Sequence, residues 1–498
     1  MKPSPGPRGL RHSTLWNGGA QVAPVASAAI AIPFLSRGLG EERLGLLLLA
    51  WTVVSMVSVL DLGVGRALTQ MIAVRRSGAR SAELRSVATI GVRISGASGL
   101  AAGLLLIALS GWITSALGAE GGIQREASVA VVLVALGLPF LLVANAFRAT
   151  LDGLERFDLS ARARIPTGSL TFLLPAALVP FTQRLDVAVG ALVAVRCVGG
   201  LVLGVMAARS LPDRVPDATA GPSPVRELLH LGGWVSVGNL ASMILVYADR
   251  FIIASFVSIA AIAHYATASE VVTKLLIGPI AVAGVWFPAL ARTGSPADGD
   301  FEALAQRGIR LVTALIVPAL VTLIVLADPV LRLWAGLDGA WGGVSVLRYL
   351  AIGVFLNAIA QIPFSTLHAR ARPDVVARLH VLQLPLYFAL LGWALPRFAL
   401  VGAAISWTIR SGADMLCLLV AATRVEPGFR AAAALAGILA FEGVLLLSLS
   451  IWIAREVDAL SISLLMVPIS GAWVWGRVLT PAWRDLILTQ WPRSGGTD

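Results

Sequence analysis

Apolar stretches long enough to cross a membrane recur along almost the entire chain. A helix needs about 20 residues to span the hydrocarbon core of a bilayer, and in lipid a helix satisfies its own backbone N–H and C=O groups. We identify about 14 such stretches, at approximately residues 15–35, 44–65, 86–109, 127–147, 165–182, 187–208, 229–251, 260–290, 311–327, 344–367, 379–395, 398–422, 431–453 and 459–476. The sequence therefore predicts an all-α integral membrane protein with about 14 transmembrane helices.

The composition excludes an ordinary soluble protein. Only 13% of the 498 residues are charged, and the mean hydropathy is +0.83. In soluble globular proteins about 25% of residues are charged. Because the segments between the apolar stretches are short, we expect no separate soluble domain.

The positive charges follow a topological pattern. If the N-terminus lies in the cytoplasm, 26 of the 39 lysines and arginines fall in cytoplasmic segments, nine fall on the opposite side and four lie within spans. Cytoplasmic loops of membrane proteins are enriched in Lys and Arg. We therefore expect both termini in the cytoplasm and no removable signal peptide. The formal net charge of +11 is attributed to topology rather than to a nucleic-acid partner.

Sequence motifs of the common enzyme and cofactor sites are missing. We find no glycine-rich phosphate loop, no nucleophile elbow and no His or Cys set with metal-ligand spacing. Cys197 and Cys417 both fall within spans and are expected to be small core residues. The sequence thus predicts no catalytic residue, no cofactor, no metal and no use of ATP bound to this chain, so we expect a protein that is not an enzyme.

An internal duplication is visible at an offset of about 216 residues. Thr, Leu, Arg, Asp, Ala and Arg of segment 150–162 recur at the matching positions of segment 366–378, and Arg196 matches Arg410 at an offset of 214. Two copies of six helices each begin and end on the same side of the membrane, so the repeats would be parallel, as in many transporters. We expect an N-terminal lobe over 1–215, a C-terminal lobe over 216–425 and two further helices over 426–498.

Four cations lie within the predicted spans: Arg93, Arg196, Lys274 and Arg410. A charged residue at the centre of a helix in lipid costs roughly 2.5 to 3.5 kcal/mol on insertion scales, so such residues normally face a wet cavity or a partner. Because Arg binds phosphate oxygens bidentately and Lys binds them as a point charge, these four residues are candidates for binding an anionic substrate.

Acidic residues accompany these cations. Glu270 lies four residues before Lys274, and Asp414 lies four residues after Arg410, spacings that place each pair on one helical face. Together with Asp61 and Asp249, these acids are candidates for ion coupling or gating by a proton or Na⁺. Purely structural ion pairing remains an alternative for all of them. Glu442 has no partner nearby in sequence, so we expect a protonated, neutral carboxyl there.

Several motifs, in this order, resemble those of the bacterial polysaccharide-biosynthesis flippases of the O-antigen and exopolysaccharide type. They are Asn17-Gly-Gly-Ala-Gln21, Pro33-Phe-Leu-Ser-Arg-Gly-Leu-Gly40, Leu60-Asp-Leu-Gly-Val-Gly65, Tyr247-Ala-Asp-Arg-Phe-Ile-Ile253, Tyr265 ahead of Lys274, Phe287-Pro288, Ala360-Gln-Ile-Pro363 and Ala403-Ala-Ile-Ser-Trp-Thr-Ile-Arg410. The likeness spans roughly residues 14 to 425.

This resemblance implies membership of the multidrug, oligosaccharidyl-lipid and polysaccharide exporter superfamily. The expected activity is translocation of an undecaprenyl-diphosphate-linked oligosaccharide across the bacterial cytoplasmic membrane by alternating access, with a polysaccharide polymerase as a further partner. By similarity, Lys274 and Asp249 match positions that line the cavity. The first two helices lack the intramembrane arginines of the peptidoglycan-precursor branch, which favours a sugar-polymer repeat unit over lipid II.

Two other functions are compatible with the sequence. One is a cation-coupled exporter of drugs or metabolites in the same superfamily, although cationic cargo would call for intramembrane acids rather than a surplus of arginine. The other is a polytopic glycosyltransferase or polymerase that acts on the same lipid carrier, although the external loops are short for such an enzyme.

Overall fold

The structure of the protein is a computed structural model. It shows an all-α integral membrane protein. The structure describes residues 7–55, 64–76, 83–116, 121–212, 224–292, 300–334, 336, 342–370, 372–457, 459–481 and 484. Within these residues, 11 helices are long and apolar enough to cross a membrane. Two of them, α1 and α14, each cover two of the spans predicted from the sequence, and α8 runs over the predicted span 229–251.

The chain divides into two compact units. Unit 1 comprises residues 1–266 and 335–337, and unit 2 comprises residues 267–334 and 338–498. Unit 1 contains α1 (Pro7–Ser55), α3 (Val64–Arg76), α4 (Leu84–Ala116), α5 (Gly121–Gly153), α6 (Phe157–Thr182), α7 (Leu185–Ser210) and α8 (Pro224–Phe256). The boundary falls inside α9 (Ile259–Thr273). The lobe limits predicted from the internal duplication stay a prediction.

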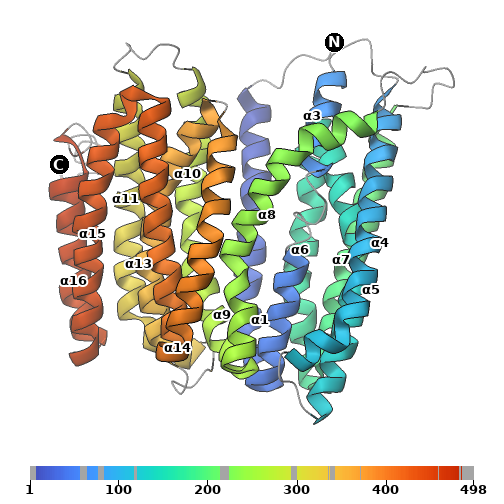
Figure 1. The fold of residues 1–498 in the computed structure, drawn as a ribbon, viewed down its shortest axis with the longest axis horizontal. Coiled ribbons are helices and arrows are strands. Elements are labelled where there is room, and N and C mark those ends of the chain that lie inside the picture. The colour runs from blue at the N-terminus through green and yellow to red at the C-terminus, as the bar shows by residue number, and fades with distance from the viewer. Residues whose placement is uncertain are drawn as a thin grey trace, which may run out of the picture. The chain divides into compact units, whose positions relative to one another are not determined.

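Unit 2 consists of the end of α9, from Thr267, and the elements that follow it. They are η2 (Lys274–Leu276), α10 (Ile277–Arg292), α11 (Asp300–Val325), α12 (Ala327–Pro329), η3 (Val330–Trp334), α13 (Gly343–Ala369), α14 (Pro373–Val425), η5 (Pro427–Phe429), α15 (Arg430–Glu456), α16 (Ala459–Trp473) and η6 (Val474–Val478). Figure 1 shows α11, α13, α14, α15 and α16 running side by side in this unit.

Single residues break the two longest helices. Gly40 interrupts α1 with φ 74° and ψ 171°, and Ala399 interrupts α14 with φ 47° and ψ −135°. Positive φ costs a glycine little but strains an alanine. At Ala399 the chain turns, and the two halves of α14 pack against each other. The hydrogen bond that Gln383 in the first half donates to Asp414 in the second shows this contact.

In unit 1, α1 packs along α6, α5 packs against α4 and α7, and α6 also contacts α7. The helices α4 and α5 approach closely at Gly99, where a Cβ atom would lie 2.6 Å from the Cα of Pro139. An ion pair joins three helices: both Nε and Nη2 of Arg43 on α1 donate to Glu126 on α5, at 2.8 and 2.7 Å. Glu126 also accepts the N–H of Leu185, the first residue of α7, at 3.0 Å.

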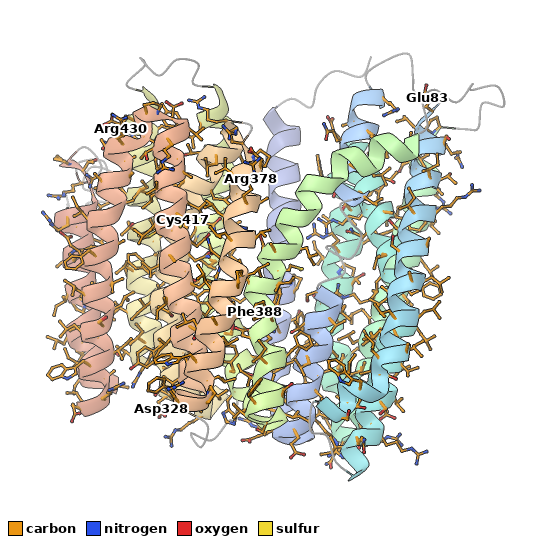
Figure 2. The ribbon with its side chains drawn as sticks, viewed as in Figure 1. Glu83, Asp328, Arg378, Phe388, Cys417 and Arg430 are labelled. Atoms are coloured by element: carbon orange, nitrogen blue, oxygen red, sulfur yellow. The ribbon has the colours of Figure 1, made fainter. Side chains whose placement is uncertain are left out.

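Labelled side chains of unit 2 lie at different levels along its helices. In Figure 2, Arg378 and Arg430 lie at one end of the unit, Asp328 lies at the opposite end, and Phe388 and Cys417 lie between them. The topology predicted from the sequence likewise places Arg378 and Arg430 together on one side of the membrane.

One sequence expectation is wrong in this unit. Glu442 on α15 is not an isolated carboxyl, because it binds Arg477 in η6 and accepts a hydrogen bond from Trp473 Nε1 on α16 at 3.0 Å. Arg477 lies 35 positions further along the chain, so a search restricted to sequence neighbours could not find the pair.

Candidate functional site

A cavity of about 380 Å³ lies within unit 1, between α1, α5, α6 and α7. Three arginines line it: Arg148 at the end of α5, Arg164 on α6 and Arg196 on α7. Asn145 and Thr167 add polar surface, and the remaining lining is mostly apolar, with Phe172 as its largest aromatic side chain.

The cavity carries excess positive charge. Arg148 Nε lies 3.4 Å from Asp152, one turn further along α5. Within the part of the chain that the structure describes, neither Arg164 nor Arg196 has a carboxylate oxygen within 4.0 Å. The guanidinium groups of Arg148 and Arg164 are close enough to repel each other. Such repulsion favours an anion between them.

Arg196 lies deep in the helix bundle and still reaches the cavity. Its Nε donates a hydrogen bond of 3.1 Å to the hydroxyl of Thr171 on α6, and part of its side chain remains accessible. One turn further along α7, a Cβ atom at Gly199 would lie 2.3 Å from Thr167 Oγ1. Glycine at this position therefore allows α7 to approach α6 closely beside the cavity.

This arrangement is suited to binding an oxyanion. Guanidinium groups donate paired hydrogen bonds to carboxylate or phosphate oxygens, and their strength increases where water is largely excluded. Three guanidinium groups with one nearby carboxylate can neutralise a ligand that carries about two negative charges. Among the described residues, no group of three or more His, Cys, Asp or Glu side chains could hold a metal ion.

The four cations predicted to bind substrate are divided between the units, with Arg93 and Arg196 in unit 1 and Lys274 and Arg410 in unit 2. Only Arg196 lines the unit 1 cavity; Arg93 is exposed on α4, on the same face as the exposed Leu100 and Leu104. Lys274, in unit 2, is also exposed, and its Nζ lies 2.8 Å from Glu270, as the four-residue spacing predicts.

Arg410 and Asp414 belong to a buried polar cluster within α14. Their side chains do not form the direct ion pair that the four-residue spacing suggested. Asp414 instead accepts a hydrogen bond of 2.8 Å from Gln383 Nε2 and lies 3.4 Å from His380 Nε2. Arg410 donates to Ser411 at 3.1 Å and stacks near the rings of Tyr387 and Trp407. The partners of Asp414 come from the other half of α14, which sequence spacing along one helix cannot reveal.

Asp249 is a buried acceptor in unit 1. It is 2% exposed, and it accepts hydrogen bonds from the hydroxyl of Tyr265 at 2.5 Å and from the backbone N–H of Arg250 at 2.8 Å. Nη1 of Arg250 donates to Thr52 on α1 at 2.8 Å. The fourth candidate acid, Asp61, lies outside the described residues.

Sequence reasoning missed Arg148 and Arg164, which it assigned to cytoplasmic segments. The structure instead extends α5 to Gly153 and begins α6 at Phe157, so both arginines project from helices into the cavity. Their spacing from polar neighbours was the available signal, because Asn145 and Arg148 are three residues apart, as are Arg164 and Thr167, and residues at this spacing share a helical face.

A model of the polysaccharide biosynthesis protein family matches residues 34–338, which is more than half of the chain. The chain belongs to this family. The resemblance inferred from the sequence motifs is thereby confirmed. A Shigella flexneri relative described as "Putative O-antigen transporter" is 28% identical to this polysaccharide biosynthesis protein over 414 residues, which cover 83% of this chain and 97% of the relative.

Solved structures show the same fold for this polysaccharide biosynthesis protein. A multidrug resistance MATE family transporter of the MOP superfamily, in an inward-facing conformation, has a TM-score of 0.69 at 16% identity and covers 82% of this chain and 96% of its own. The lipid II flippase MurJ, in an inward closed conformation, has a TM-score of 0.69 at 14% identity and covers 95% of this chain and 99% of its own.

Proposed function

We propose that this polysaccharide biosynthesis protein is a flippase. Its substrate would be an undecaprenyl-diphosphate-linked oligosaccharide, the repeat unit of a surface polysaccharide, carried from the inner to the outer leaflet of the bacterial cytoplasmic membrane by alternating access. Family membership and the relative described as an O-antigen transporter support this activity. The fold shared with MurJ is consistent with it.

The observation that carries the proposal is the arginine-lined cavity of unit 1. Arg164 and Arg196 have no carboxylate within 4.0 Å among the described residues, so they can offer their charge to a ligand. A diphosphate supplies several oxygens that guanidinium groups can bind in pairs. The lipid tail would stay in the bilayer, and the sugar would extend from the phosphate-binding end.

Transport against a concentration difference would need coupling to an ion gradient. We assign this role to Asp249 or Glu270, because a ligand that binds the two conformations with different affinity shifts their populations. Asp249 is buried and Glu270 is paired with Lys274. If Asp249→Asn and Glu270→Gln both left transport and its gradient dependence unchanged, neither acid would couple an ion. Arg93 and Lys274 remain candidate contacts of the substrate along its path.

A reconstituted flipping assay tests the cavity directly. Protein in liposomes that contain a lipid-linked oligosaccharide should move it between leaflets, and Arg164→Gln should reduce the rate at least tenfold, since one charge-assisted contact to phosphate contributes about 1.5 to 3 kcal/mol. The matched control is Arg162→Gln, which alters an exposed arginine two residues away on the same helix and outside the cavity. Equal rates in both variants would show that the cavity does not bind the substrate.

Gene deletion provides an independent test of the substrate class. Loss of the flippase should cause a lipid-linked glycan to accumulate on the cytoplasmic leaflet, where mass spectrometry can identify it. Unchanged glycolipid together with altered sensitivity to cationic drugs would instead support an exporter of small molecules.

A further inference from the structure

The structure repeats one local arrangement in both units. In unit 1, α6 begins after Arg156, which pairs with Asp158 at 3.3 Å; in unit 2, α14 begins after Arg372, which pairs with Asp374 at 3.0 Å. A residue with positive φ follows α6, namely Gln183 (48°), and Ala399 (47°) likewise ends the first half of α14. All three features recur at an offset of 216 residues, so α6 corresponds to the first half of α14, and α7 corresponds to its second half.

Contacts between the paired helices correspond as well. Arg196 donates to Thr171, and Arg410 stacks near Tyr387, which lies 216 positions after Thr171. One turn further, the backbone at Gly199 packs against Thr167 in unit 1. In unit 2, Asp414, which lies 214 positions after Gly200, accepts a hydrogen bond from Gln383, which lies 216 positions after Thr167.

The correspondence allows the two sites to be compared residue by residue. Arg164 of the unit 1 cavity corresponds to His380, at the same offset of 216, and Arg196 corresponds to Arg410. In unit 1, Gly199 lies beside Thr167 and Gly200 faces Ala144, and both glycines line the cavity. Unit 2 has the carboxylate of Asp414 in the corresponding place, next to His380 and Gln383.

The unit 2 cluster is built like an anion site and is closed. Asp414, Gln383, Arg410 and His380 are each at most 8% exposed. Nε of Arg410 is buried and has no hydrogen-bond partner among the described residues. A buried guanidinium N–H without an acceptor is costly, and buried donors are normally paired. Arg410 Nε is therefore a donor that Asp414 leaves unpaired, and Oε1 of Gln383 is a buried acceptor that also lacks a partner among the described residues.

We propose that unit 2 contains a second oxyanion site of the same construction as the unit 1 cavity, in which the carboxylate of Asp414 occupies the place of a phosphate group. Its ligand class is phosphate or diphosphate, and its ligating residues are His380, Gln383 and Arg410. The carboxylate of Asp414 fills this site and excludes other anions, so the anionic end of a substrate binds in unit 1 alone. The inference rests on the proposed function for the identity of the unit 1 ligand.

Calorimetric titration of the purified full-length protein with inorganic pyrophosphate tests this assignment. The native chain should bind one pyrophosphate, Asp414→Gly should bind two, and Asp414→Gly combined with Arg410→Met should again bind one. Asp414→Asn should still bind one, because the amide fills the same space. The matched control is Asp374→Asn, which changes a partly exposed acid on the same helix and should also leave one site.

Several outcomes would overturn the proposal. The proposal is wrong if a folded Asp414→Gly protein binds only one pyrophosphate. If the glycine variant does not fold, Asp414→Ser replaces it and should likewise bind two. With Asp414 in place, Arg196→Met should abolish pyrophosphate binding. If binding remained and was lost only when Arg410→Met was added, the anion would be binding in unit 2, and Asp414 would not exclude it. If the native chain binds none while Asp414→Gly binds one through Arg410, the unit 1 assignment fails and the present inference stands.

Discussion

Replacing Arg196 should raise the stability of the protein and abolish its binding of anions. The side chain lies deep in a membrane-spanning bundle, with one hydrogen bond to Thr171 and no carboxylate within 4.0 Å among the described residues. Arg196→Met keeps most of the volume and removes the charge. We expect the variant to unfold at a higher temperature than the native protein and to lose anion binding.

The magnitude follows from two opposing contributions. An arginine in the middle of a membrane helix costs roughly 2.5 to 3.5 kcal/mol on insertion scales. The lost hydrogen bond contributes about 0.5 to 1.5 kcal/mol, and Thr171 keeps its own bond to the backbone oxygen of Thr167 at 2.6 Å. The net stabilisation is about 1 to 2 kcal/mol, since access to the cavity offsets part of the cost of burying the charge.

Thermal unfolding in detergent, followed by tryptophan fluorescence, provides the assay. Without ligand, Arg196→Met should have the higher Tm. With pyrophosphate at about 100 times its Kd, the native protein should gain about 2.7 kcal/mol from binding, and the variant should gain nothing. The control Arg162→Met should stay within about 0.5 kcal/mol of the native protein. A variant that is destabilised and still stabilised by pyrophosphate would refute the reasoning.

Three further predictions concern other parts of the chain. Tyr265→Phe removes the 2.5 Å hydrogen bond to Asp249 and should destabilise the protein by about 1 to 3 kcal/mol in chemical denaturation, because the carboxylate stays buried; an unchanged midpoint would argue against a structural role for the contact. Gly99→Val places side-chain atoms against the backbone of Pro139 and should lower the free energy of unfolding by about 1 to 3 kcal/mol or more. The expected readout is a lower yield of monodisperse protein, and a normal yield would contradict the close approach of α4 and α5. Lys274→Met removes an ion pair in which the Lys274 side chain is 43% exposed and the Glu270 side chain 26%, and should change stability by about 1 kcal/mol or less; a normal flipping rate in liposomes would remove Lys274 from the substrate path.

The helices of the fold were predictable because hydrocarbon length and backbone hydrogen bonding restrict what a membrane segment can be. The sequence also placed the break in α14, between the predicted spans 379–395 and 398–422 and within three residues of Ala399, but it did not indicate the backbone conformation at this apolar residue. The turn depends on a positive φ, which sequence reasoning associates with glycine, as at Gly40 in α1.

The candidate site was only partly predictable. Arg196 was identified because a charge in the middle of a span is costly. Arg148 and Arg164 were not, because arginines near span ends are ordinarily topological and the counting rule cannot distinguish a loop from the last turns of a long helix. The neighbours of Asp414 were missed for a different reason, since His380 and Gln383 lie more than 30 positions away and meet it only after α14 folds back.

The contact of Glu442 with Trp473 and Arg477 makes the end of the chain hard to remove. A shortened protein that ended after α15 would present a bare carboxylate to lipid tails, where it would have to take up a proton or draw in water. Any attempt to ask whether the final helix serves transport must therefore pair the truncation with Glu442→Gln, or the loss of a neighbour will be mistaken for the loss of a function.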